Sequence, residues 1–329
     1  MVRIIDVAKA AGVSVSTVSH VLSKKRSISA ETTERVLATI RELGYVPNPN
    51  AQALRGSKTG IIGFIASNIT ELFASRIIEG AERAARERNS SILFASSADF
   101  DYDLLEAVRF LKRRRIDGLM VSYAISQEAG AELLSRLEIP VVGVNTRLSA
   151  ALPCVMPDNE EGGIAAARHL LERGARELAM IAGPRDRLAS RERIAGFLAG
   201  CEEAGLSLPA PQRVYFGDFS PVSGADGLDY LLKLNPDLDG IFCANDFMAA
   251  GAMNEAAARG LKVPDRLRIL GFDNREFTAF WPIPISTFAQ PLHDMGQIGA
   301  EMLFDMIEGT SPASGDVRLH PSLIHRRST

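Results

Sequence analysis

The sequence predicts a small all-α domain at the N-terminus, a short linker, and a larger α/β core of two parallel-sheet subdomains. Residues 1–47 show only helical periodicity, and a polar stretch bounded by prolines follows them. The remainder alternates short apolar runs with amphipathic segments of helical length. With 329 residues and 46% hydrophobic content, the chain is long enough for two or three packed domains.

Residues 4–22 have the pattern of two short helices joined by a tight turn. The first helix has its apolar residues at the spacing of one helical face, in Ile4, Val7, Ala8 and Ala11. Gly12 can adopt the turn conformation that other residues avoid. Ser14 stands where an N-cap belongs, with a hydroxyl that can accept from a free helix N–H. We therefore expect a second helix to begin at residue 15.

The second helix is expected to bury Val18, Val21 and Leu22 and to leave a small polar face outward. The residues on that face are Val15, Ser16, Thr17, Ser19 and His20. Two helices of this kind form a helix-turn-helix, whose second helix can enter the DNA major groove. The alternative is a plain helical hairpin packed on another element.

Residues 30–43 predict a third helix, which Ser29 can cap at its start and Gly44 can end. Its expected inward side chains are Val36, Leu37, Ile40 and Leu43. Prolines and polar residues follow. We place the end of the helical domain at residue 47 and a linker over residues 48–60, because that segment is too short and polar to form a core.

The net charge of −3 conceals an asymmetry between the two parts of the chain. Residues 1–60 contain nine Lys and Arg against four Asp and Glu, which gives them +5 and leaves −8 for the rest. A basic N-terminal domain on an acidic body places the surface that binds a polyanion at the N-terminus.

The core from residue 61 onward predicts parallel sheets covered on both faces, because continuous apolar strands alternate with helices. The expected strands, in chain order, are IIGFIAS, SILFASS, DGLMVS, PVVGVN, ELAMIAG, RVYFGD, GIFCAN and LRILGFD. Breaks at residues 157–163 and 285–291 indicate where the chain crosses between two subdomains. We expect one subdomain to comprise residues 61–158 and 289–319. The other would comprise residues 159–288 and 320–329.

Polar side chains follow the predicted strands at their carboxyl ends, the edge at which open α/β sheets bind ligands. With two phenylalanines as stacking faces, the candidates are Ser67, Phe73, Asn145, Arg187, Arg193, Phe219, Asn245, Asp273 and Gln290. Carboxylates, amides and arginines together suit a small polyhydroxylated or heterocyclic ligand. Any one of these residues could instead form a turn or cap a helix, but the set as a whole favours a binding site.

The helix-turn-helix IIDVAKAAGVSVSTVSHVL, the linker NPNAQALRGSKTG and the core together resemble the lactose-repressor/galactose-repressor family of bacterial transcription regulators. The resemblance covers essentially the whole chain and implies a core with the periplasmic-binding-protein fold. It implies that Val15, Ser16 and His20 read base edges. It also implies a hinge helix that forms on DNA, with its contacts at Asn50, Ala53, Leu54 and Arg55. Leu54 would be the apolar wedge that kinks the operator.

The same resemblance implies the roles of the strand-end residues. Arg193 in GPRDRLASRERIAGF matches the arginine that grips effectors, and Asp273 in GFDN matches its acidic partner. Phe73, Phe219 and Arg187 match the site of the purine repressor. Ala189, however, stands where that protein has a hydroxyl residue. The remaining effector positions are Ser67, Asn145, Asn245 and Gln290. A sugar or sugar derivative is the favoured effector, and a purine corepressor is the alternative.

The resemblance implies a homodimer that binds a near-palindromic operator, and we expect dimers because no leucine-rich segment follows the last predicted strand. The sequence contains no dinucleotide, P-loop, zinc-protease or serine-hydrolase motif, so we expect neither enzyme activity nor a cofactor nor a metal. An exported solute receptor would need a signal peptide in place of the basic domain. We expect a cytoplasmic protein at the nucleoid, with Cys154, Cys201 and Cys243 reduced.

Overall fold

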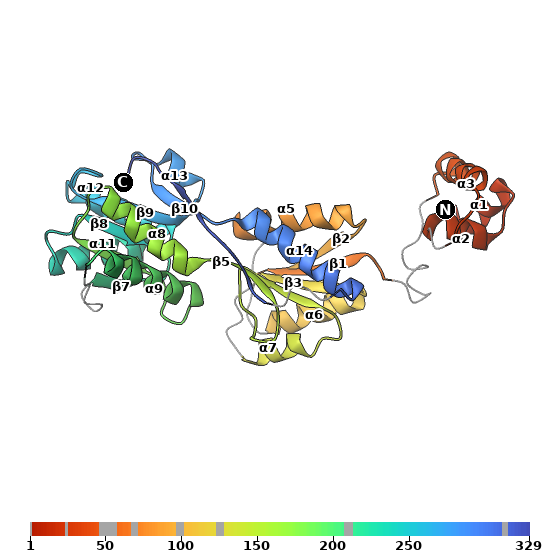
Figure 1. Ribbon diagram of the computed structural model, residues 1–329, viewed down its shortest axis with the longest axis horizontal. Helices are drawn as coiled ribbons and strands as arrows, with labels where there is room; N and C mark the ends of the chain where they lie inside the picture. The colour runs from red at the N-terminus through yellow and green to blue at the C-terminus, as the bar shows by residue number, and fades with distance from the viewer. Residues whose placement is uncertain are drawn as a thin grey trace. The chain divides into compact units, whose positions relative to one another are not determined.

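The computed structural model describes residues 2–23, 26–45, 58–66, 72–96, 102–122, 128–206, 213–310 and 315–329. The chain divides into two compact units, Met1–Thr59 and Gly60–Thr329 (Figure 1). Five of the predicted contact residues lie outside the described residues, namely Asn50, Ala53, Leu54, Arg55 and Ser67. Each unit is described by itself below.

The N-terminal unit contains three helices, α1 (Ile4–Ala11), α2 (Val15–Ser23) and α3 (Ala30–Leu43). They share a core around Val7, Val18 and Val36, each fully buried. Gly12 ends α1 in the left-handed conformation at φ +65°, and the Ser14 hydroxyl accepts from the Thr17 N–H at 3.1 Å. The helix-turn-helix therefore forms through the turn and the cap that its sequence predicts.

The first sheet of the core has six strands in the order β11-β5-β4-β3-β1-β2, all of them parallel. Their bounds are β1 (Ile61–Ala66), β2 (Ser91–Ser96), β3 (Gly118–Ser122), β4 (Val141–Val144), β5 (Cys154–Pro157) and β11 (Val317–Leu319). Side chains alternate along β1: Ile62 and Phe64 join the cluster under one pair of helices, and Ile65 joins the cluster under the other. The helices are α5 (Leu72–Glu87), α6 (Tyr102–Arg113), α7 (Glu128–Ser135) and α14 (Leu292–Glu308). Figure 1 shows α5 and α14 on one face and α6 and α7 on the other.

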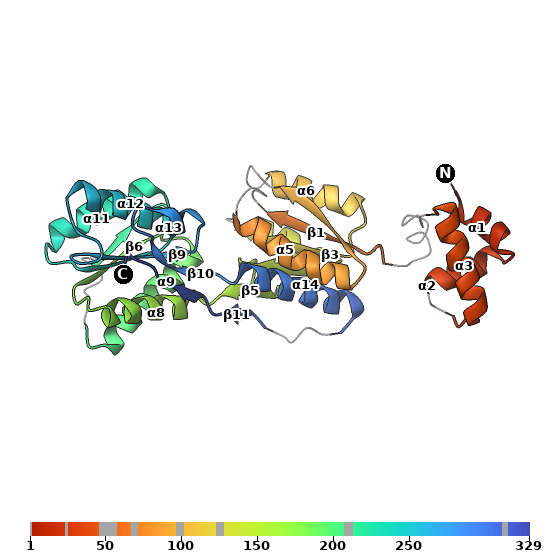
Figure 2. The ribbon, with the colours of Figure 1, turned by 90° about the horizontal axis from the view of Figure 1, so that it is seen from above.

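The second sheet has the order β12-β10-β9-β8-β6-β7, with β12 antiparallel at one edge. Its strands are β6 (Leu178–Ala182), β7 (Val214–Phe216), β8 (Gly240–Cys243), β9 (Arg268–Asp273), β10 (Ser286–Ala289) and β12 (Ser322–Ile324). The helices around it are α8 (Asn159–Glu172), α9 (Leu188–Glu203), α11 (Pro221–Leu234), α12 (Asp246–Ala258) and the short α13 (Phe277–Phe280). In Figure 2, α8 and α9 lie on one face of this sheet and α11 and α12 on the other.

Within the described residues, the chain passes between the two sheets three times. It leaves the first sheet after β5, returns after β10 to form α14 against α5, and crosses again between β11 and β12. Each sheet is thus completed by a segment from the far end of the chain. A change in one sheet's position relative to the other must be absorbed at these three crossings.

Glycines set the distance between the paired helices on each sheet. A Cβ at Gly196 of α9 would lie 1.9 Å from the Glu160 carbonyl oxygen of α8. On the first sheet, a Cβ at Gly80 of α5 would lie 1.9 Å from the His293 carbonyl oxygen of α14. Real Cβ atoms do not approach oxygen so closely, so both helix pairs pack backbone against backbone.

Three details of the sequence prediction need correction. Strand β5 was absent from the predicted set, because CVMP is only four residues long and ends in proline. The run at 178–182, expected as the fifth strand, is therefore the sixth. Leu37, expected in the core of the helical unit, is 40% exposed, since the helices of so small a unit cover only one stripe of α3.

Candidate functional sites

The predicted outward face of α2 has one freely exposed residue, Ser16. The Ser14 hydroxyl lies 2.7 Å from the Ser16 hydroxyl and 2.8 Å from that of Thr17, so the three form one cluster at the start of the helix. Val15 packs partly on the core of the unit. Thr17, Ser19 and His20 are half-buried. The N-terminal turn of α2 is therefore the part of this face that a DNA groove can reach first.

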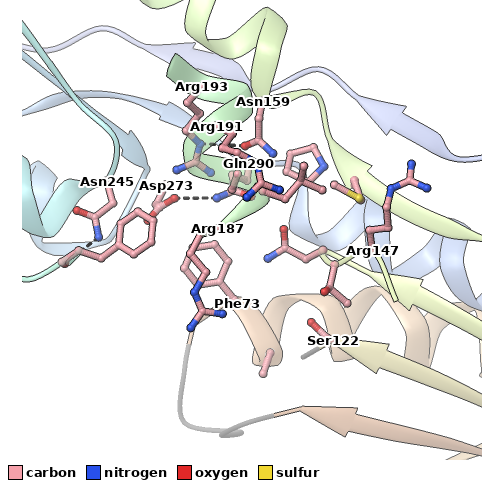
Figure 3. Close-up of a pocket in the computed structure, with 18 of the residues that line it drawn as sticks. Phe73, Ser122, Arg147, Asn159, Arg187, Arg191, Arg193, Asn245, Asp273 and Gln290 are labelled. Atoms are coloured by element: carbon pink, nitrogen blue, oxygen red, sulfur yellow. Dashed lines mark hydrogen bonds between the residues drawn. The ribbon is translucent and has the colours of Figure 1, made fainter. Parts of the chain in front are cut away.

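The core contains a cavity of about 820 Å³ whose walls come from both sheets (Figure 3). Every predicted effector residue that the structure describes lines it, namely Phe73, Asn145, Arg187, Arg193, Phe219, Asn245, Asp273 and Gln290. The carboxyl ends of parallel strands meet at one edge, which explains why residues so far apart in the sequence gather here. A cavity of this size suits a small organic ligand.

Other residues of the cavity wall were not singled out from the sequence, among them Ser122, Arg147, Asn159, Arg191, Phe247 and Arg275. Ser122 ends β3, Arg147 follows β4, and Arg275 follows β9, so the strand-end rule applied to every strand would have found them. Asn159 follows β5, which the sequence did not reveal.

Arg193 and Asp273 form the buried polar centre of the cavity. The Arg193 Nε donates to Asn159 Oδ1 at 2.9 Å, and a terminal N–H donates to the Ala244 carbonyl. Gln290 Nε2 donates to Asp273 Oδ1 at 2.7 Å, as Figure 3 shows. Burial raises the pKa of Asp273 to about 6, although the Arg193 charge opposes the rise. Burial likewise lowers the pKa of Arg193.

Asp246, directly behind this centre, fixes the loop that follows β9. It accepts from the Thr287 hydroxyl and from the Arg275 backbone N–H, each at 2.6 Å. Burial and the neighbouring Asp273 raise the pKa of Asp246. Two carboxyls this close and this buried disfavour a second negative charge, so protonation of one stabilises the ionised form of the other.

Asn245 has both of its amide atoms committed to protein partners. Its Oδ1 accepts from the Met248 N–H at 2.8 Å and caps α12, and its Nδ2 donates to the Phe219 carbonyl at 3.0 Å. In this structure Asn245 therefore acts as a helix cap, the alternative to a ligand contact considered from the sequence. Its side chain lines the cavity while it holds the loop that carries Phe219.

The two phenylalanines expected as stacking faces have different surroundings. The Arg275 guanidinium lies over the Phe73 ring at 4.9 Å and over the Phe247 ring at 4.8 Å, so a cation fills one face of each ring. Phe219 adopts a left-handed φ of +69°, and its ring packs where a Cβ on Gly183 would lie. The Arg275 cation and the Phe73 ring therefore lie together on the cavity wall.

A chain of hydrogen bonds leads from Arg193 to a crossing between the sheets. Asn159 Nδ2 donates to Glu192 Oε2 at 3.0 Å, and Arg318 of β11 donates to Glu192 Oε1 at 2.8 Å. Arg318 belongs to the first sheet and Glu192 to a helix of the second. A ligand that moves Arg193 can thus act on the contact between the two sheets.

The described parts of the chain contain no cluster of His, Cys, Asp or Glu that could hold a metal ion. They also contain no helix long and apolar enough to cross a membrane. All three cysteines are free and buried, and burial raises the pKa of the Cys201 thiol to about 12.

Comparison with known families gives two matches. The model for bacterial regulatory proteins of the lacI family matches residues 3–48. The model for a periplasmic binding protein-like domain matches residues 167–329. The first covers the helix-turn-helix unit, and the second covers every strand of the second sheet together with α14 and β11 of the first.

Relatives match the chain along its whole length. The HTH-type transcriptional repressor PurR of Klebsiella pneumoniae (strain 342) is 33% identical over 334 residues, which cover 100% of this chain and 97% of the relative. Among solved structures, the lac repressor dimer bound to operator and the anti-inducer ONPF has a TM-score of 0.82 at 27% identity, covering 100% of this chain and 99% of that one. The complex of the transcriptional regulator CelR with cellobiose has a TM-score of 0.73 at 28% identity, with 100% of both chains covered.

Proposed function

The chain belongs to the lacI family of bacterial regulatory proteins and is a DNA-binding transcription repressor, and from this premise we propose that a small ligand in the core cavity controls its operator affinity. The observation that carries the proposal is the cavity itself, whose wall combines buried polar groups from both sheets. A ligand that contacts both walls stabilises one relative position of the two sheets over others. The three crossings would transmit that preference toward the linker at residues 48–60.

On the DNA side, α2 would enter the major groove and present Val15, Ser16, Thr17, Ser19 and His20 to the bases. A homodimer would place two such helices on half-sites of a near-palindromic operator, one helical turn apart. Paired hinge segments carrying Asn50, Ala53, Leu54 and Arg55 would bind the minor groove between the half-sites, with Leu54 as the wedge. Such a protein acts in the cytoplasm, at the nucleoid.

For the effector, a sugar or sugar derivative is our first choice. Amide and carboxyl groups of Asn145, Gln290 and Asp273 line the cavity and can bond to hydroxyl groups. The related CelR binds cellobiose. A purine corepressor is the second candidate, supported by the identity to PurR and opposed by Ala189 on the cavity wall.

The proposal is tested by selecting genomic DNA fragments with the purified full-length protein and then measuring operator affinity with and without candidate ligands. We expect one enriched near-palindromic sequence whose affinity changes with a sugar derivative. The matched variant is Arg193→Lys, which keeps the charge but loses the planar fork that bonds Asn159. It should bind the operator and lose the response. A full response in this variant would contradict the assigned site.

A further inference from the structure

We propose that the ligand of the cavity is a hydroxylated small molecule carrying an oxyanion, as in a sugar phosphate or a sugar carboxylate, and that Arg187 and Arg275 bind that group. The inference rests on the proposed function, since it assigns a chemical class to the same site. It follows from the charges on the cavity wall and from the partners that each charge already has.

The charged residues on the wall are unbalanced. Five arginines face two aspartates, and the residues are Arg147, Arg187, Arg191, Arg193, Arg275, Asp186 and Asp273. Within the described residues the wall therefore carries an excess of three positive charges when both aspartates are ionised. The whole chain has a net charge of −3, so this local excess runs against the overall balance.

Three of these arginines are engaged elsewhere. Arg147 pairs with Asp316 of the loop before β11. Arg193 bonds to Asn159 and the Ala244 carbonyl and lies beside Asp273. Arg191 donates to the Asp186 carbonyl at 2.8 Å, which fixes its direction but leaves its charge without a carboxylate.

Arg187 and Arg275 are different, because within the described residues neither side chain has a hydrogen bond or an ion pair. Arg187 is exposed at the N-cap of α9 and makes no side-chain cap bond. Arg275 is half-buried, and its Nε is buried without a partner. A buried N–H of this kind is costly unless an acceptor arrives.

The surroundings of Arg275 suit an anion. The guanidinium carbon lies 4.9 Å from the centre of the Phe73 ring and 4.8 Å from that of the Phe247 ring, so two aromatic rings contact this cation. The Nε of Arg275 is buried away from water, which strengthens its attraction for a negative charge. A planar guanidinium fork matches the geometry of a carboxylate or phosphate in a bidentate contact.

The N-terminus of α9 adds to this attraction. Leu188 and Ala189, its first two residues, line the cavity, and helix N-termini carry free N–H groups and a partial positive charge. The wall also contains groups that suit hydroxyls. Gln290 Oε1 is buried without a partner among the described residues, beside the Asp273 carboxyl. The wall thus contains both groups that suit hydroxyls and groups that suit an oxyanion.

An uncharged ligand, such as a neutral sugar or a neutral purine, would not use the positive charges on the cavity wall. A neutral sugar could bond to Asp273 and Gln290 but would bring no counter-charge to Arg187, and Arg275 would keep only the attraction of the Asp273 carboxylate. A neutral purine could stack on a ring, but Arg275 already covers one face of Phe73 and of Phe247.

The test is a thermal-shift and calorimetric titration of the full-length protein at constant ionic strength. The probes are glucose 6-phosphate, fructose 1-phosphate, gluconate, glucuronate, inorganic phosphate, glucose, fructose and hypoxanthine. The variants are Arg187→Gln and Arg275→Gln. The matched control is Arg185→Gln, which removes the same charge from the loop that carries Arg187 but lies outside the cavity wall, over Phe216.

We expect at least one anionic sugar to raise the melting temperature more than its neutral counterpart. Each cavity variant should weaken that binding by about 10- to 100-fold, the loss of affinity expected when one hydrogen bond to a charged group is removed. The control should leave the affinity unchanged. A phosphate hit and a carboxylate hit distinguish the two sources of the oxyanion.

Three results would overturn the inference. If glucose, fructose or hypoxanthine binds and no anionic probe binds better, the oxyanion assignment is wrong and the proposed effector site stands. If anionic probes bind equally well to the wild type and to both cavity variants, the anion is held elsewhere. If no probe of either charge binds, the oxyanion assignment is wrong, while the proposed function is decided by the operator measurements described above.

Discussion

Asp273→Asn is expected to stabilise the ligand-free core at neutral pH. Asp273 ends β9 and is 8% exposed, and its burial is the main cause that raises its pKa to about 6. Asparagine has nearly the same shape and can still accept from Gln290, but it carries no charge. The substitution therefore removes the free-energy cost of keeping a carboxylate in this position.

The size of the effect follows from the pKa. A rise from 3.8 to about 6 corresponds to about 3 kcal/mol in the free energy of unfolding. This value already includes the attraction between Asp273 and Arg193, which lowers the pKa of Asp273 and so reduces the rise. Between these two values the folded state binds more protons than the unfolded state, so stability falls as the pH rises. The variant should match the wild type near pH 4 and exceed it by about 3 kcal/mol above pH 6.

Urea unfolding at a series of pH values measures this difference. Trp281 is the only tryptophan of the chain and packs against the core of the second sheet, so its fluorescence reports the unfolding of that sheet and its helices. Asp237→Asn is the matched control, because Asp237 is exposed. Its stability should follow the wild type at every pH. A variant at Asp273 that is less stable than the wild type at pH 7, or that differs equally at pH 4 and pH 7, would refute the reasoning.

Three further variants test the packing, the helix cap and the hinge. Gly196→Ala should destabilise the core by about 1–3 kcal/mol in urea unfolding, because its methyl group meets the α8 backbone, and unchanged stability would contradict the close packing. Ser14→Ala removes the cap of α2 and should lower the stability of the helical unit by about 0.5–2 kcal/mol, with Ser27→Ala as control. Circular dichroism of residues 1–59 measures it, and an equal loss in both variants would argue against the cap. Leu54→Ala should weaken operator binding and reduce DNA bending while the unfolding of the core stays unchanged. Wild-type affinity and bend angle in that variant would disprove the wedge.

The local features of the molecule could be predicted from the sequence. The turn at Gly12 and the cap at Ser14 involve residues within a few positions of each other, so spacing alone determines them. The gathering of strand-end residues in one cavity was also predictable, because parallel strands end at a common edge. This prediction needed only the topology of the sheet and no knowledge of side-chain contacts.

The partners of the site residues could not be predicted in this way. Arg275 lies over Phe73, about two hundred positions away, because of how two sheets and three crossings bring them together. Asn245 faces the cavity but has its amide committed to Met248 and Phe219, which depends on the loop geometry. The glycine contact between α8 and α9 depends on the helix axes, which no periodicity in the sequence specifies.

The central claim is that a ligand in the core cavity changes the affinity of the protein for DNA. Fluorescence anisotropy with the selected operator, with and without the ligand identified by the titration above, measures this most directly. The account predicts a 5- to 150-fold change in operator affinity in the wild type, the usual range of such coupling, and little change in Arg193→Lys. Equal operator affinity of the wild type with and without saturating ligand would contradict it.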